Sequence, residues 1–151
     1  MAMTMNGEYQ LAVPRETVWE KLNDAATLKT CIPGCEQLDK LSDTEMQAVA
    51  VLKIGPVKAK FKGKVTLSDL DPPNGYKISG QGDGGIAGFA TGGAAVKLAP
   101  KDGGTLLTYT VEAQIGGKLA QLGQRLVNGA AKKLADDFFQ KFAAAVSPPS
   151  A

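Results

Sequence analysis

One amphipathic segment, residues 117–146, constrains most strongly what this chain can fold into. Apolar side chains recur along it at three- and four-residue spacing, which is the spacing of one helical face. They are Leu119, Leu122, Leu126, Ala130, Leu134, Phe138 and Phe142. Gly116-Gly117 precedes the segment and Pro148-Pro149 follows it, so both ends carry helix-boundary signals. The segment predicts a long C-terminal helix whose apolar face must be covered by the rest of the chain.

Upstream of this segment, short runs alternate between apolar and polar residues. Such alternation is typical of strands that bury one face. The runs cover residues 3–13, 45–54, 57–67, 89–98 and 107–115, with shorter ones near Leu38 and from Tyr76. Between the first two runs, Pro14 and the apolar Val18-Trp19-Leu22 group predict a short helix, and residues 25–30 predict a second.

Strands joined by tight turns favour an antiparallel sheet with one apolar face. The predicted fold is α+β: a seven-stranded curved antiparallel sheet wrapped around the long C-terminal helix, with two short helices after the first strand. At 151 residues, we expect a single domain over residues 1–146. A Pro/Ser/Ala tail at residues 147–151 would then be the start of a linker.

The composition excludes several classes of function. The chain has no histidine, which excludes Ser-His-Asp and Cys-His catalysis and His-ligated zinc. Its two cysteines, Cys31 and Cys35, are too few for a structural zinc site, so we expect no metal site and no cofactor. A net charge of +2 argues against a nucleic-acid partner. Without a recognisable signal peptide or a long apolar run, we expect a cytoplasmic protein with reduced thiols.

Small residues on the inward faces suggest a cavity between the sheet and the C-terminal helix. Space beside them could hold a ligand, although close backbone packing explains the same residues. If a ligand pocket is present, we expect it to be lined by Ile32, Ala48, Ala50, Leu52, Phe61, Gly63, Phe89, Tyr109, Val111, Leu126 and Ala130. The inward faces carry almost no titratable group apart from Tyr9 and Tyr109. General acid-base catalysis needs such a group, so we predict ligand binding and no catalytic residues.

Two further motifs have a structural and a functional interpretation. Lys58, Lys60, Lys62 and Lys64 occupy outward positions of one strand, which suits a solvated sheet face or a docking surface for an acidic partner or anionic lipid. The turn Cys31-Ile32-Pro33-Gly34-Cys35 suits a pair of buried thiols or a loop at the mouth of the cavity with Ile32 at its tip.

The order of short motifs along residues 5–146 resembles one family. The motifs are Gly7-Glu8-Tyr9, Val18-Trp19, Leu22-Asn23-Asp24, the Cys31–Cys35 turn, Gly55-Pro56-Val57, Phe61-Lys62-Gly63, Asp71-Pro72-Pro73, Gly104-Thr105, Leu107, Tyr109, Gly116-Gly117-Lys118-Leu119-Ala120, Leu122-Gly123-Gln124-Arg125 and Phe138-Phe139. Together they resemble the carbon monoxide dehydrogenase CoxG family, within the SRPBCC superfamily of START and Bet v 1-like helix-grip proteins.

The resemblance implies a non-catalytic accessory protein of a molybdenum hydroxylase system. Such a protein would assist maturation of a molybdenum-containing dehydrogenase, such as a carbon monoxide dehydrogenase, or its recruitment to the cytoplasmic membrane. The wider superfamily implies an apolar ligand in the cavity, a quinone or another lipid. A peripheral contact with the inner face of the cytoplasmic membrane is also expected. The alternative is a small-molecule enzyme of the same fold, a cyclase or hydrolase.

Overall fold

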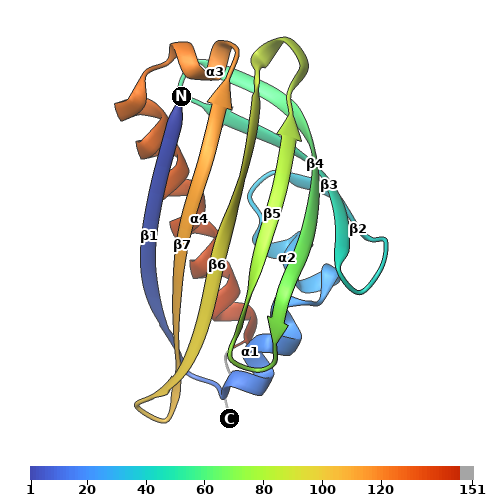
Figure 1. Ribbon diagram of the computed structural model, residues 1–151, viewed down its shortest axis with the longest axis vertical. Coiled ribbons are helices and arrows are strands. Elements are labelled where there is room, and N and C mark those ends of the chain that lie inside the picture. The colour runs from blue at the N-terminus through green and yellow to red at the C-terminus, as the bar shows by residue number, and fades with distance from the viewer. Residues whose placement is uncertain (147–151) are drawn as a thin grey trace.

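Seven antiparallel strands form one curved sheet that wraps around a long C-terminal helix (Figure 1). The computed structural model describes residues 1–146, and the tail predicted at residues 147–151 lies outside the described residues. In chain order, the elements are β1 (Ala2–Leu11), α1 (Arg15–Leu22), α2 (Ala25–Cys31), β2 (Cys35–Lys40), β3 (Glu45–Ile54), β4 (Val57–Asp71), β5 (Gly75–Asp83), the 3-10 helix η1 (Gly85–Ala87), β6 (Phe89–Lys101), β7 (Gly104–Gly116), α3 (Lys118–Gln121) and α4 (Gln124–Val146). The predicted α+β fold class is confirmed.

The strand order across the sheet is β1-β7-β6-β5-β4-β3-β2. The first strand therefore pairs with the last, with Ala2 opposite Gln114 and Leu11 opposite Thr105. All other neighbouring strands are consecutive in the sequence, and antiparallel neighbours of this kind can be joined by short turns. This arrangement leaves β1 and β2 as the two edges of the sheet.

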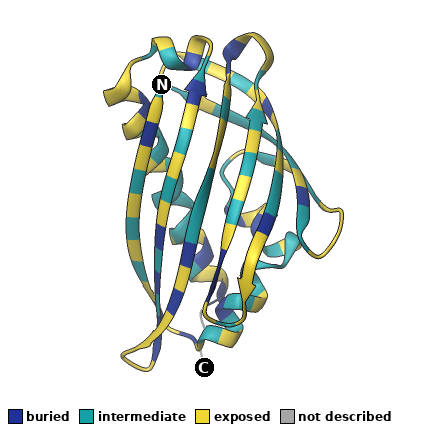
Figure 2. Ribbon diagram, in the orientation of Figure 1, coloured by how far each residue is buried: buried dark blue, intermediate teal, exposed yellow. Residues whose placement is uncertain are grey.

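Burial alternates along the strands because successive side chains point to opposite faces (Figure 2). On β7, Leu107, Tyr109 and Ile115 are buried, whereas Thr110 and Glu112 are exposed. The inner face of the sheet is therefore apolar and covers α4, and the outer face meets solvent.

The C-terminal helical segment is interrupted, which differs from the single helix predicted for residues 117–146. The short helix α3 ends at Gln121, and α4 begins at Gln124. Gly123 lies between them with a φ of 89°, a left-handed conformation that glycine adopts readily and a right-handed helix does not contain. The prediction of one continuous helix was wrong at its start, because apolar spacing continues through Gly123 while the helical backbone does not.

The buried face of α4 also begins one residue later than the apolar spacing predicts. Val127 is buried, whereas Leu126, which the spacing placed on the apolar face, is 39% exposed. Further along α4, Ala131 and Ala135 pack against the core, and Phe142 is fully buried.

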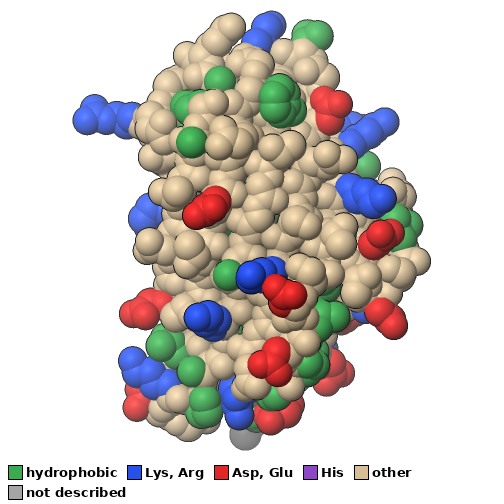
Figure 3. All heavy atoms as spheres, in the orientation of Figure 1, with side chains coloured by type: hydrophobic (Ala, Val, Ile, Leu, Met, Phe, Trp, Pro, Cys, Tyr) green, Lys and Arg blue, Asp and Glu red, His purple; other side chains and the backbone are tan. Residues whose placement is uncertain are grey.

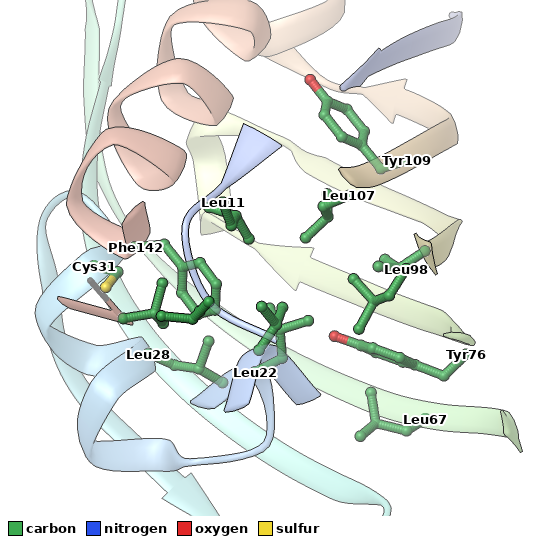
Figure 4. Packing of buried hydrophobic residues seen from close by; sticks show 14 of the residues in the cluster. Leu11, Leu22, Leu28, Cys31, Leu67, Tyr76, Leu98, Leu107, Tyr109 and Phe142 are labelled. Carbon is green, nitrogen blue, oxygen red and sulfur yellow. The ribbon is translucent and has the colours of Figure 1, made fainter. Parts of the chain in front are cut away.

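Two apolar clusters make up the core along α4. The larger cluster joins α1, α2 and the C-terminal half of α4 to the inner face of the sheet (Figure 4). The smaller cluster includes Phe61, Leu119 and Val127, near the start of α4. Val111 of β7 packs against both clusters. The larger cluster contains the cavity described next.

Candidate ligand-binding site

An apolar cavity of about 220 Å³ lies within the larger cluster. Leu22 of α1, Leu28 of α2 and the Phe138-Phe139 pair of α4 line it on the helical side, and residues of β2 to β7 line it on the sheet side. Among the described residues that line it, none is charged, and Gln47 and Tyr76 are the only polar side chains. Gln47 is exposed and alternates with Met46 and Ala48 to the other face of β3.

Aromatic rings on one side of α4 and small residues on the other explain why this space stays open. Towards β1 and β7, the ring of Phe139 stacks on Tyr9 and Tyr109, with ring centroids 4.4 Å and 5.3 Å apart. Phe138 packs edge-on against Phe139 at 5.0 Å. Towards β3, the cavity is lined by Ala48, whose single methyl group does not reach across to these rings.

Tyr76 is the titratable side chain of the cavity, and the sequence patterns did not identify it as a site residue. It is 6% exposed, and its ring meets the edge of Trp19 with centroids 5.3 Å apart and planes at 84°. Burial raises the pKa of the Tyr76 hydroxyl above its ordinary value. The hydroxyl is therefore neutral at physiological pH and offers the cavity one hydrogen-bond donor.

The structure places the predicted pocket residues at several sites. Ile32 and Ala48 line the cavity. Leu52, Leu126 and Ala130 instead line an open groove of about 570 Å³ between β3, the Pro33-Gly34 turn and α4. This groove also carries Lys53, Arg125, Lys133 and Asp137, so it is more polar than the cavity. The turn that follows Ile32 lies between the two spaces.

The remaining predicted pocket residues lie outside both spaces. Phe61 is buried in the smaller cluster, and Val111 packs against both clusters. Tyr109 is buried in the larger cluster, and Phe89 is 47% exposed at the start of β6. Ala50 lies opposite Phe61 and Cys35, and Gly63 lies opposite Ala48 and Gly82. The last pairings place both small residues on neighbouring strands of the β3–β4 side.

A polar pair joins β1 to α4 beside the aromatic rings. The hydroxyl of Tyr9 donates a hydrogen bond to a carboxylate oxygen of Asp136, and Lys132 donates another to the same side chain at 3.0 Å. These two bonds lower the pKa of Asp136, while burial and the bond to Asp136 raise the pKa of Tyr9. Neither side chain lines the cavity. The sequence patterns gave no sign of Asp136 because charged helix residues are usually solvated.

The two thiols are free, with Cys31 buried and Cys35 partly buried. Burial raises the pKa of Cys31, which disfavours the reactive thiolate. Within residues 1–146, no group of three or more acidic or cysteine side chains is arranged to hold a metal ion. In the same part of the chain, no helix has the length and apolar character needed to cross a bilayer.

The four predicted docking residues, the β4 lysines, are Lys58, Lys60, Lys62 and Lys64. All four are exposed on the outer face. Acidic side chains offset part of their charge: Glu36 forms an ion pair with Lys60 at 3.2 Å, and Asp83 lies opposite Lys62. Basic and acidic side chains also lie close together along the β4 margin of the space-filling view (Figure 3).

A shallow depression of about 660 Å³ occupies the outer face of the sheet. It is lined mainly by small and hydroxyl side chains, including Gly92, Gly93 and Thr110. The centre of this face is correspondingly poor in charged side chains (Figure 3). Because it is open to solvent and lacks an apolar lining, we regard the internal cavity as the better ligand site.

Comparison with known proteins agrees with this architecture. A structure described as a conserved protein from Geobacillus kaustophilus is 37% identical with a TM-score of 0.89, over 95% of both chains. The Zhui aromatase/cyclase from Streptomyces sp. R1128 is 11% identical with a TM-score of 0.70, over 97% of this chain and 94% of that one. Ara h 8.0201 is 17% identical with a TM-score of 0.68, over 97% and 98%. At these lower identities the likeness concerns the fold alone.

No curated protein matches this chain in sequence. The family model of the carbon monoxide dehydrogenase protein CoxG matches residues 7–147, which is nearly the whole chain. The residues expected to carry the resemblance fall within that match. The chain therefore belongs to the carbon monoxide dehydrogenase CoxG family.

Proposed function

We propose that this protein is a non-catalytic accessory protein of a molybdenum hydroxylase system similar to carbon monoxide dehydrogenase, and that it binds an apolar ligand, a quinone or another lipid. The observation that carries the proposal is the cavity of about 220 Å³, in which no charged side chain of residues 1–146 takes part in the lining. Apolar cavities with few polar groups are typical of small-molecule sites. Family membership supports the association with a dehydrogenase.

The side chains of the cavity favour binding over a cyclase or hydrolase reaction. General acid-base catalysis needs a group that exchanges a proton near the working pH. Tyr76 is the titratable residue of the lining, and its raised pKa makes it a poor base. Tyr9 and Asp136 bond to each other outside the cavity. The cyclase of similar fold is therefore a weak guide to the activity of this chain.

The turn after α2 suggests how a ligand enters and leaves. Ile32 lines the cavity, and the next two residues, Pro33 and Gly34, line the open groove. The amide of Val51 donates a hydrogen bond to the carbonyl of Gly34 at 2.9 Å, which holds the turn against β3. Displacement of this turn would connect cavity and groove. The role of the β4 lysines is to orient the protein towards an acidic partner or the inner face of the cytoplasmic membrane, where maturation or recruitment of the dehydrogenase takes place.

Native mass spectrometry of freshly purified protein tests the ligand directly. We expect an apolar molecule to remain bound to the wild-type chain. Ala48→Leu adds bulk where Ala48 lines the cavity, so this variant should lose the bound molecule. Ala95→Leu makes the same change at the outer depression and should retain it.

Two results would contradict the proposal. Equal retention of the molecule by Ala48→Leu and Ala95→Leu would show that it binds elsewhere. A wild-type chain that carries no molecule and takes up no quinone or lipid from added vesicles would remove the ligand-binding role altogether.

A further inference from the structure

The Tyr76 hydroxyl is a hydrogen-bond donor without a partner inside an apolar cavity. No hydrogen bond joins this hydroxyl to another group within residues 1–146. Its oxygen is not sealed off either, because every completely enclosed side-chain nitrogen or oxygen in that range has a partner. Tyr76 itself is 6% exposed and lines the cavity. The hydroxyl therefore faces the open space of the cavity.

We infer that Tyr76 is the polar anchor of the ligand site, and that the ligand is an apolar molecule with a neutral hydrogen-bond acceptor, such as a carbonyl group, directed at its hydroxyl. The inference rests on the proposed ligand-binding function and narrows the chemical class of the ligand. A buried donor without a partner is unfavourable, and a bound acceptor would satisfy it.

The position of the ring supports a role for the hydroxyl that packing does not explain. The Tyr76 ring reaches from β5 into the cluster, with its oxygen on the side of Leu22 (Figure 4). The edge-on contact with Trp19 involves only the ring, and a phenylalanine would make the same contact. Within residues 1–146, the fold therefore uses the ring of Tyr76 and makes no hydrogen bond with its hydroxyl.

The surroundings select a neutral acceptor over a charged one. No described lining residue carries a charge that could pair with a carboxylate or an ammonium group, and an unpaired charge is strongly disfavoured in an apolar environment. The raised pKa of Tyr76 keeps its hydroxyl protonated, so it acts as a donor. A free fatty acid would therefore place its carboxylate elsewhere.

The volume of the cavity limits the part of the ligand that reaches Tyr76. About 220 Å³ is below the ~300–1,000 Å³ of sites for drug-sized ligands. It corresponds to roughly seven water molecules at about 30 Å³ each. One or two fused rings with a carbonyl fit such a space, and a longer apolar chain would have to extend towards the groove.

A matched pair of probes tests the inference without knowledge of the natural ligand. The ketone α-tetralone and the hydrocarbon tetralin share a ring system, and only the ketone has an acceptor. Methyl-labelled methionine reports binding, because Met46 alone among the four methionines lines the cavity. We expect Tyr76→Phe to raise the ratio of the ketone Kd to the hydrocarbon Kd about fivefold, the typical effect of one hydrogen bond. Comparing ratios cancels the difference in water solubility between the probes.

Tyr9→Phe is the control, because it removes a hydroxyl that does not line the cavity, and it should leave the ratio unchanged. A second measurement needs no variant: the labelled ζ carbon of Tyr76 should shift with α-tetralone and remain in place with tetralin. If both probes shift Met46 but the ratio is the same in wild type and Tyr76→Phe, the anchor is refuted and the cavity remains a ligand site. If neither probe shifts Met46, the ligand-binding function fails together with the anchor.

Discussion

The hydroxyl of Tyr9 donates a hydrogen bond to a carboxylate oxygen of Asp136, which lies 127 residues further along the chain. This bond ties the first strand of the sheet to the last helix. It forms beside the stacked rings of Tyr9 and Phe139, so a polar and an aromatic contact hold the same two elements together. The pair therefore connects the protonation of Asp136 to the packing of α4 against β1.

Replacement of Tyr9 by phenylalanine should weaken the dependence of stability on acid pH. The Tyr9 and Lys132 hydrogen bonds lower the pKa of Asp136 in the folded state. A carboxylate with a lowered folded pKa stabilises the fold above its unfolded pKa of about 3.9, and this contribution is lost as the pH falls through the folded value. We expect the free energy of unfolding of Tyr9→Phe to fall less than that of wild type below about pH 4.

Urea denaturation at a series of pH values measures this effect. Asp137→Asn is the control, because Asp137 lines the groove and its replacement leaves the Tyr9–Asp136 bond intact. Parallel pH profiles for wild type and Tyr9→Phe would show that the bond does not contribute to acid stability.

Two buried hydroxyls in this protein should respond in opposite ways to removal. Thr105 is fully buried, and its hydroxyl donates a hydrogen bond to the carbonyl of Val13 at 2.8 Å. Thr105→Val leaves that carbonyl without its partner and should cost about 1–3 kcal/mol. Tyr76→Phe breaks no hydrogen bond within residues 1–146, so the ligand-free protein should keep its stability or gain up to about 1 kcal/mol. A Tyr76→Phe variant as destabilised as Thr105→Val in urea denaturation would contradict this assignment.

Removal of the Trp19 side chain should destabilise the fold by about 3 kcal/mol, because large aromatic side chains leave a cavity when truncated to alanine. Trp19 is partly buried against the larger cluster and packs edge-on against Tyr76. Circular dichroism in urea is the suitable measurement, since Trp19 is the only tryptophan of the chain. Trp19→Phe should lose clearly less stability; an unchanged midpoint for Trp19→Ala would refute a structural role.

Replacement of the four β4 lysines by glutamine should affect association more than stability. Exposed charges contribute little to folding, so the free energy of unfolding should stay within about 1 kcal/mol of wild type. Binding to anionic vesicles or to the cognate dehydrogenase should weaken, and its dependence on salt should decrease.

A control variant separates a local effect from net charge. Replacing Lys29, Lys77, Lys97 and Lys101, which are also exposed, removes the same charge from α2, β5 and β6. If both variants bind equally well at low salt, the β4 lysines are a solvated face and have no docking role.

The sheet could be predicted from sequence because its signal is local. Strand residues alternate with a period of two, so β3 was predicted with its observed bounds, Glu45–Ile54. The C-terminal helix has an equally clear period, yet the left-handed backbone at Gly123 interrupts it without changing the apolar spacing. Leu126 was consequently assigned to the ligand pocket and lies instead in the exposed groove.

The candidate site depended on contacts that sequence patterns do not record. Ala48 could be named because a small residue in an apolar alternation indicates space. Asp136 could not be distinguished from the solvated charges of α4, since its partner Tyr9 is distant in sequence. Tyr76 follows the same alternation as any inward strand residue, and only its surroundings reveal a hydroxyl without a partner.

The pairing of β1 with β7 sets the order in which the chain can close during synthesis. Ala2 leaves the ribosome first, but its partner Gln114 follows roughly ten seconds later at bacterial rates of about 5–20 residues per second. Throughout that interval the first strand is an unpaired edge, which favours association with other chains. Only when β7 has emerged can Met3 and Leu11, both buried in the finished core, be sheltered by their neighbouring strand. The segment translated earliest is therefore among the last to be protected, which makes the nascent N-terminus a natural substrate for ribosome-associated chaperones.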